Sequence, residues 1–263
     1  MKQVTARVIS NQKVMPDASL MWLEAPAIAE SAQAGQFVLV QTGENFLPRP
    51  VSIHQKKDSQ IALLIRVTGS GMEWLSVRSV GEAIRLTGTL GNGFSIKPNA
   101  KNLLLVAGGM GIAPLIFLAK QAVNKGLSVT LLYGTVNTNR YPDRMVPSQI
   151  KVIAATEDGS VGQKGLVTSL IPDYIDKADQ VFACGPLAMY KDLAKRKTEL
   201  LKNKPCQISL EMRMACGHGV CYGCTIETKK GLKQVCKDGP VFELDDVENL
   251  LKDDALCLRW LTV

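Results

Sequence analysis

The sequence lacks any apolar run long enough to cross a bilayer. Hydrophobic residues make up 46% of its 263 residues, but no run approaches the roughly twenty consecutive apolar residues that a spanning helix requires. Residues 1–8 alternate in the manner of a β-strand, so we expect no signal peptide there. The sequence therefore predicts a protein that has no membrane segment.

Dense basic runs with interleaved aromatic residues are also missing. The net charge is +7, and the excess lies in residues 1–205, because the part from Cys206 onward holds seven basic and nine acidic residues. The most basic stretch, Lys191–Lys197, has the pattern of a solvated helix face. We therefore expect no nucleic-acid binding, whereas a basic body suits cofactors that carry phosphate.

The cysteine count argues against a disulfide framework. There are seven cysteines, an odd number, and four of them fall within 21 residues. This usage favours a reducing, cytoplasmic setting. Only two histidines occur: His54 is expected to be a surface or satisfied histidine, and His218 lies inside the cysteine-rich stretch. No Ser/His/Asp arrangement stands out, so we expect no catalytic triad.

The four clustered cysteines have the spacing C-x4-C-x2-C followed by eleven residues and a fourth cysteine. They are Cys216, Cys221, Cys224 and Cys236. The x4/x2 spacing is typical of plant-type [2Fe–2S] sites, in which a tight loop wraps three thiolates around the cluster. A structural zinc site is the alternative, but it usually has two C-x2-C pairs and only one is present here. The spacing favours the iron–sulfur cluster.

Hydrophobic patterning divides the chain into three parts. Residues 1–98 contain short alternating or β-branched runs separated by Gly and Pro, which predicts a small antiparallel β-barrel. Residues 99–203 contain continuous apolar runs that alternate with helical patterns, which predicts a parallel α/β sheet of the Rossmann-like kind. Residues 204–263 form a small cysteine-rich part that ends in an acidic stretch.

The first candidate cofactor site is Arg49-Pro50-Val51-Ser52. Prolines on both sides of Arg49 stiffen the backbone and aim the guanidinium, which can fork onto a phosphate. A structural turn between two strands is the alternative. Farther along, Leu64-Ile65-Arg66 is followed by Gly71-Met72 at the start of a predicted helix, where free amides can bind an anion.

Two further candidate sites lie in the α/β part. The turn Gly108-Gly109-Met110-Gly111 follows a buried strand and opens a helix, which is the context of a dinucleotide site, although a plain tight turn would have the same pattern. Cys184-Gly185-Pro186 ends another strand, where the thiol could lie near a nicotinamide. A small buried cysteine is the alternative there.

Taken together and in this order, these motifs resemble the ferredoxin–NADP reductase superfamily over essentially the whole chain. That family pairs a flavin-binding β-barrel, marked by R-x-[YFV]-S, with a nicotinamide-binding α/β domain marked by G-G-x-G-x-x-P and C-G-P. The matching stretches are Arg49–Ser52, Gly108–Pro114 and Cys184–Pro186. A C-terminal [2Fe–2S] domain is a narrower feature, and with it the chain looks like the electron-transfer subunits of type B dihydroorotate dehydrogenases.

The resemblance implies a set of cofactor contacts at the matching positions. For FAD they are Arg49, Pro50, Val51, Ser52, Leu64, Ile65, Arg66, Gly71 and Met72. For NAD they are Gly108, Gly109, Gly111, Cys184, Gly185 and Pro186. The cluster ligands would be Cys216, Cys221, Cys224 and Cys236. Met72 stands where the family usually has Thr, and Ile65 where it often has Tyr, so a hydroxyl contact to phosphate and an aromatic partner for the flavin are missing.

The resemblance also implies a relay in pyrimidine biosynthesis. Electrons would pass from the FMN of a catalytic partner subunit, through the [2Fe–2S] cluster and FAD, to NAD+, in a heterotetramer with two copies of each subunit. This chain would not itself bind dihydroorotate. The alternatives are a flavin subunit of another NAD(P)H complex, of the sulfhydrogenase or transhydrogenase type, and a zinc-stabilised binding module. The sequence does not decide between NAD and NADP.

Overall fold

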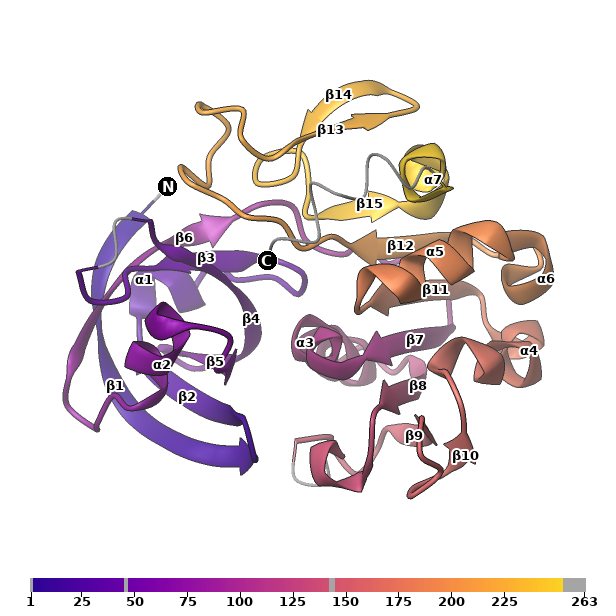
Figure 1. Cartoon of the computed structure of the whole chain (residues 1–263), viewed down its shortest axis with the longest axis horizontal. Coiled ribbons are helices and arrows are strands. Elements are labelled where there is room, and N and C mark those ends of the chain that lie inside the picture. Colours follow the sequence, from indigo (N-terminus) through magenta and orange to yellow (C-terminus); the bar gives the residue numbers. More distant parts are fainter. Residues whose placement is uncertain (1, 45–46, 142–144, 253–263) are drawn as a thin grey trace.

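The alternating strands near the N-terminus close into an antiparallel barrel. The computed structural model describes residues 2–44, 47–141 and 145–252, and Figure 1 shows the barrel at one end of the molecule. Its strands follow the order β1-β2-β5-β4-β3-β6. Their bounds are Lys2–Met15, Ala18–Glu24, Phe37–Val40, Arg49–Lys57, Gln60–Arg66 and Ala83–Leu90, numbered β1 to β6 in chain order. Two short helices, α1 (Pro26–Ala29) and α2 (Ser70–Ser76), lie in its connections.

Continuous apolar runs form the second sheet. The strand β7 (Asn102–Gly108) is buried on both faces from Leu103 onward, as a central parallel strand should be. The sheet order is β10-β9-β8-β7-β11-β12-β15, in which only the edge pair β12–β15 is antiparallel among the pairings of the described residues. The other strand bounds are Ser128–Thr135 (β8), Lys151–Thr156 (β9), Gln163–Lys164 (β10), Gln180–Cys184 (β11), Cys206–Ser209 (β12) and Val241–Glu243 (β15).

Helices cover both faces of this sheet. Their bounds are Ile112–Asn124 (α3), Ile171–Tyr174 (α4), Leu187–Lys195 (α5), Lys197–Leu201 (α6) and Leu244–Lys252 (α7). Four 3₁₀ turns are found in the described part: Gly109–Gly111 (η1), Thr138–Arg140 (η2), Val167–Leu170 (η3) and Ile175–Lys177 (η4). The predicted barrel and α/β sheet are therefore confirmed. Within the described ranges, no helix is long and apolar enough to span a membrane.

The last part of the chain lies above both units. It contributes β12 and the edge strand β15 to the sheet, and between them it forms the cysteine loop and the hairpin β13 (Thr225–Thr228) and β14 (Gly231–Gln234). In Figure 1 this orange and yellow segment runs over the barrel and over the sheet. Cys257 lies outside the described residues, and Cys206 is buried in β12.

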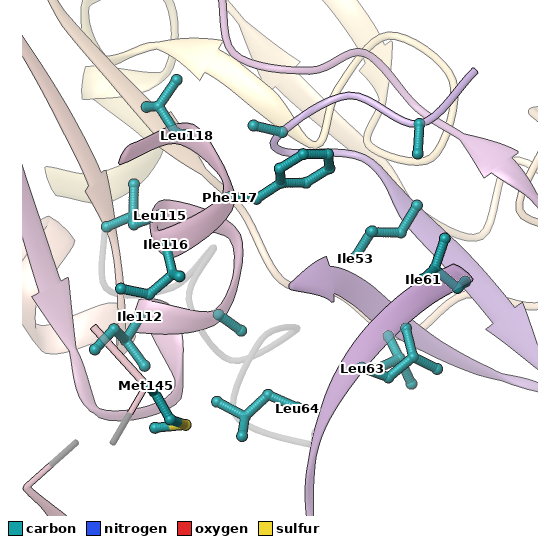
Figure 2. Close-up of a cluster of buried hydrophobic side chains, with 14 of the residues drawn as sticks. Ile53, Ile61, Leu63, Leu64, Ile112, Leu115, Ile116, Phe117, Leu118 and Met145 are labelled. Atoms are coloured by element: carbon teal, nitrogen blue, oxygen red, sulfur yellow. The ribbon is translucent and has the colours of Figure 1, made fainter. Parts of the chain in front are cut away.

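The barrel and the sheet share one hydrophobic core through α3. Figure 2 shows Phe117 of α3 facing Ile53 of the barrel, and Ile112 and Leu64 belong to the same buried cluster. A polar contact crosses the same interface: the His54 Nδ1 lies 2.9 Å from the Ala113 carbonyl oxygen. The His54 Nε2 lies 2.9 Å from Gln55 Nε2, and Lys120 of α3 bonds Gln55 Oε1. A neutral imidazole satisfies both hydrogen bonds: Nδ1 donates to the Ala113 carbonyl oxygen, and Nε2 accepts from Gln55 Nε2.

The burial of His54 predicts acid sensitivity. Desolvation, partly offset by the bond to Ala113 and reinforced by the charge of Lys120, lowers the pKa of His54 from 6.5 to about 4. The unfolded chain takes up this proton below pH 6.5 and the folded chain does not. The free energy of unfolding should therefore fall by about 3 kcal/mol between neutral pH and about pH 4 through this group.

Denaturant titrations across that pH range test this expectation. In the variant His54→Gln, which keeps a polar side chain but cannot titrate, the fall should be smaller by about that amount. If the free energy of unfolding falls equally with pH in the wild type and in His54→Gln, then His54 is not the source of the acid sensitivity.

Candidate functional site

A cavity of about 370 Å³ lies between the barrel and the sheet. The barrel contributes Asp17 and Arg66 to its wall, and the sheet contributes residues at the carboxyl ends of β7, β8, β9 and β11. Five of the predicted nicotinamide residues line it: Gly108, Gly109, Gly111, Gly185 and Pro186. In open α/β sheets, ligands bind in the crevice outside these strand ends.

The two glycine motifs pack directly against each other. A Cβ on Gly111 would lie 1.9 Å from the Cys184 carbonyl oxygen, and one on Gly108 would lie 2.6 Å from Pro186 Cδ. Both distances are shorter than atoms can approach, so glycine is required at the two positions. The two sequence motifs thus form a single wall, because a side chain at either position would force them apart.

Cys184 lies behind this wall and is not among the residues that line the cavity. The side chain is 1% exposed, and its Sγ lies 3.8 Å from the Ser209 carbonyl oxygen. Burial, aided by the charge of Glu211, raises the pKa of the thiol above its usual range. The neighbouring Tyr190 hydroxyl accepts the Gly185 N–H and donates to Ser209, which fixes the turn. In this structure the cysteine supports the wall.

An ion-pair network stands at the mouth of the cavity. Asp17 Oδ2 lies 3.0 Å from Arg66 Nε and 3.0 Å from Arg140 Nη2. Asp17 and Arg66 belong to the barrel and Arg140 follows β8, so one carboxylate joins the two units. The acidic residues Glu157 and Glu211 also line the cavity. Sequence patterns gave no signal for Asp17 or Glu211, whereas Glu157 could have been found as an acidic residue shortly after the apolar run at residues 152–155.

The flavin motif lies at the start of β4, which pairs with β3. Pro50 pairs with Leu39, and Arg49 pairs with Val40. Arg49 Nη1 donates to the Leu47 carbonyl oxygen at 3.1 Å, and a Cβ on Gly71 would lie 3.3 Å from Arg49 Nε. The structure therefore brings the predicted arginine beside the predicted glycine turn. A guanidinium next to the first turn of a helix is a suitable donor set for a phosphate.

The remaining predicted flavin residues differ in exposure. Leu64 and Ile65 are buried in the barrel core, so only their backbone is available to a ligand. Met72 is partly buried and packs against the same core. Ser52 is half-buried and Val51 is buried on β4. Ile65 stands where the family often has an aromatic residue. Because Ile65 is buried, this difference affects the packing of the barrel core more than the surface of the barrel.

The four cysteines of the loop come together in two pairs. The first pair is Cys216 and Cys221, whose side chains hydrogen-bond, and the second is Cys224 and Cys236. The Cys236 N–H lies 3.4 Å from Cys224 Sγ. Within the described ranges, no three His, Cys, Asp or Glu side chains gather around one metal position. Two pairs of thiols suit a two-iron cluster, in which each iron takes two cysteines.

Backbone amides around the loop favour thiolates. Partial burial tends to raise the pKa of Cys216, but N–H groups of His218, Cys221 and Val220 and the Cys221 thiol lower it to about 6. Burial, together with the Cys224 and Cys216 sulfurs, raises the pKa of Cys236 to about 12. The His218 ring faces the Cys216 carbonyl oxygen at 2.6 Å. The donor set is therefore four sulfurs with amides aimed at them, which fits an iron–sulfur cluster.

The cluster loop packs on the flavin barrel. A Cβ on Gly217 would lie 2.6 Å from Leu39 Cδ1 and 3.0 Å from Leu90 Cδ1, so glycine permits the close approach. Asn92 Nδ2 donates to the carbonyl oxygens of Lys237 and Asp238, at 3.2 and 3.0 Å. Leu39 is the strand partner of Pro50 in the flavin motif. The cluster loop thus packs on the strand that is the immediate neighbour of the flavin-motif strand.

Comparison with known proteins agrees with this geometry. A family model, the iron–sulfur cluster binding domain of dihydroorotate dehydrogenase B, matches residues 211–248, which contain all four loop cysteines. The chain is 37% identical over 250 residues to the electron transfer subunit of dihydroorotate dehydrogenase B (NAD(+)) from Caldanaerobacter subterraneus subsp. tengcongensis, which covers 93% of this chain and 98% of that relative. This chain belongs to that family of electron transfer subunits.

Two further comparisons extend the assignment. The electron transfer subunit of the same name from Clostridium acetobutylicum is 39% identical over 210 residues, covering 79% of this chain and 83% of the relative. Among solved structures, that of an NADH-dependent reduced ferredoxin–NADP oxidoreductase, studied for flavin-based electron bifurcation, superposes with a TM-score of 0.84. It is 25% identical and covers 98% of this chain and 97% of its own. Family membership and fold are thus supported over almost the whole length.

The contact between the two glycine motifs predicts that a methyl group at Gly111 weakens NAD+ binding. Gly111→Ala should weaken NAD+ binding by at least about tenfold, because the new methyl forces the glycine turn away from Cys184. Gly126→Ala is the matched control: its φ is +76°, a Cβ there meets no atom within 4 Å, and Gly126 is not among the residues that line the cavity. NAD+ titration of the flavin absorbance measures both. Equal affinities for the two variants would contradict the packing argument.

Proposed function

We propose that this chain is the electron-transfer subunit of an NAD-dependent dihydroorotate dehydrogenase, working in pyrimidine biosynthesis. The observation that carries the proposal is the presence, in one chain of this family, of a cluster loop, a flavin motif and a nicotinamide crevice in contact with one another. Such a chain is an oxidoreductase component that uses FAD, an iron–sulfur cluster and NAD.

Each group has a residue set that fits it. Cys216, Cys221, Cys224 and Cys236 hold the cluster. The motif Arg49–Ser52, with the backbone of Leu64-Ile65-Arg66 and of Gly71-Met72, holds FAD. The wall formed by Gly108–Gly111 and Gly185-Pro186 holds the nicotinamide, with Cys184 supporting it. When bound, the cluster carries single electrons, the flavin exchanges one and two electrons, and the nicotinamide accepts a hydride.

The packing supports this order of sites. The Gly217 backbone lies on Leu39, whose strand partner is Pro50 of the flavin motif, so the loop and the flavin strand hold their ligands on adjacent surfaces. The cavity lies on the opposite flank, lined by Arg66 of the barrel and by the two glycine motifs. The flavin motif would therefore have the cluster loop on one neighbouring surface, while the nicotinamide crevice lies between the barrel and the sheet.

The exposed end of the cluster loop supports docking of a partner. Val220 and Tyr222 are 66% and 70% exposed, and they flank Cys221, whose side chain is also exposed. Exposed apolar residues beside a metal loop are typical of an interface. We place the FMN-containing catalytic subunit of dihydroorotate dehydrogenase on this face, in a cytoplasmic heterotetramer with two copies of each subunit.

A second function is favoured by one comparison. The resemblance to the bifurcating ferredoxin–NADP oxidoreductase covers the whole chain, so a flavin and iron–sulfur subunit of another NAD(P)H complex would use the same sites. Activity decides between them, since only the proposed function requires a partner that oxidises dihydroorotate. A zinc-stabilised binding module would bind zinc at the same thiols and would be colourless.

The proposal is tested by replacing one exposed ligand. Cys221→Ser should reduce iron and sulfide content and bring dihydroorotate-dependent NAD+ reduction by the co-purified complex to background, while FAD content stays at the wild-type level. Cys206→Ala removes a buried thiol that lies outside the loop, and it should keep the iron. Full coupled activity in Cys221→Ser would refute the ligand assignment. Failure of the wild-type complex to oxidise dihydroorotate would refute the function.

Glu157 supports NAD as the dinucleotide. Glu157 follows β9 on the cavity wall, and its N–H donates to the Thr135 carbonyl oxygen at 3.1 Å. A carboxylate on the cavity wall can accept a hydrogen bond from the ribose 2′-hydroxyl of NAD, and its charge repels the 2′-phosphate of NADP. Arg140, the cation nearby, is already paired with Asp17.

The preference for NADH over NADPH should depend on the Glu157 carboxylate. Glu157→Gln should raise the ratio of kcat/KM for NADPH over NADH by about tenfold in a dye-reduction assay, because the repulsion is removed. Asp158→Asn is the control, since Asp158 bonds Ser160 and is not among the cavity residues. A ratio that changes equally in both variants would contradict the role of Glu157.

A further inference from the structure

One buried donor beside the cluster loop has no partner. Gln234 is the last residue of β14 and is 7% exposed, yet its Nε2 finds no hydrogen-bond partner among the residues that the structure describes. Leaving a buried amide donor unbonded is costly, so such groups in native proteins normally meet a partner or a ligand. An unpaired donor at this place therefore indicates a ligand.

The side chain of Gln234 lies against the loop that carries the first two cluster cysteines. A Cβ on Gly219 would come within 2.6 Å of Gln234 Oε1, so the carboxamide rests on the Gly219 backbone. Gly219 lies between Cys216 and Cys221, and its own N–H bonds the sulfur of Cys236. The carboxamide is thus packed on a backbone group that already reaches a cluster sulfur.

The backbone of Gln234 holds this position. Its N–H donates to Asp238 Oδ2 at 2.7 Å, and its carbonyl oxygen accepts the N–H groups of Lys237 and Asp238. Gln234 also pairs with Thr225 across the hairpin, next to Cys224, and it precedes Cys236 by two residues. The residue is therefore fixed between the two segments that supply the second pair of thiols.

We propose that Gln234 donates a hydrogen bond from Nε2 to a sulfur of the iron–sulfur cluster, either an inorganic sulfide or a cysteine ligand, and thereby raises the reduction potential of the cluster. The proposal rests on the proposed function, since it needs the cluster. A reduced cluster carries one more negative charge than an oxidised one, so a donor stabilises the reduced form more. Gln234 is a positioning and tuning residue and does not replace any cysteine ligand.

The test is the midpoint potential of the cluster, measured by redox titration of the FAD-containing chain with the reduced cluster followed by electron paramagnetic resonance. Gln234→Met, which keeps the length and removes the donor, should shift the reduction equilibrium about tenfold toward the oxidised form, or about 59 mV for a one-electron couple. Gln234→Glu, which replaces the donor by a carboxylate, should shift it further in the same direction.

The controls separate this inference from the proposed function. Gln163→Met makes the same exchange on the exposed strand β10 and should leave the potential unchanged. Iron and sulfide content is measured in every variant. If Gln234→Met does not retain its cluster, the midpoint potential of Gln234→Glu tests the role of Gln234. Cluster-loaded variants with the wild-type potential would overturn the role of Gln234 alone. A wild-type chain that binds zinc and no sulfide would overturn both the inference and the proposed function.

Discussion

The close packing of the cysteine loop on the flavin barrel is the contact on which the arrangement depends. Gly217 has a φ of +72° and touches Leu39, and Asn92 bonds the carbonyl oxygens beside Cys236. These contacts involve both segments that supply cysteines, so each segment is anchored to the same face of the barrel. Glycine is needed at position 217 because a side chain there would push the loop away from Leu39 and Leu90.

A second close contact shapes the nicotinamide crevice. Gly111 meets the Cys184 carbonyl oxygen so tightly that the ends of β7 and β11 behave as one wall. Asp17 joins the two units across the mouth of the cavity, and α3 joins them below it through a shared apolar core. The barrel therefore has anchored neighbours on two sides, which keeps the flavin motif between the cluster loop and the nicotinamide crevice.

Features encoded by local spacing could be predicted from the sequence. The C-x4-C-x2-C run, the strand–glycine–helix turn at Gly108 and the alternation of the first ninety residues each depend on neighbouring residues, and the structure has the expected elements at these places. Motif order then added the family resemblance, which the comparisons confirm. The placement of individual site residues on cofactors stays a prediction.

Features that depend on distant segments could not be predicted. The antiparallel edge strand β15 joins the sheet after an excursion of about thirty residues through the cysteine loop. Glu157, Asp17 and Arg140 meet the cavity only through the arrangement of barrel and sheet, and Gln234 meets Gly219 only when the hairpin folds back. The burial of Cys184 depends on Tyr190 and Ser209, which no spacing rule connects to the C-G-P motif.

The central claim is that a single chain holds an iron–sulfur cluster and a flavin side by side. Joint analysis of iron, acid-labile sulfide, zinc and FAD in the purified chain tests it most directly. We expect two irons and two sulfides for each FAD, with flavin bands and a broad iron–sulfur absorbance in the same protein. Stoichiometric zinc without sulfide, or a protein without flavin, would contradict it.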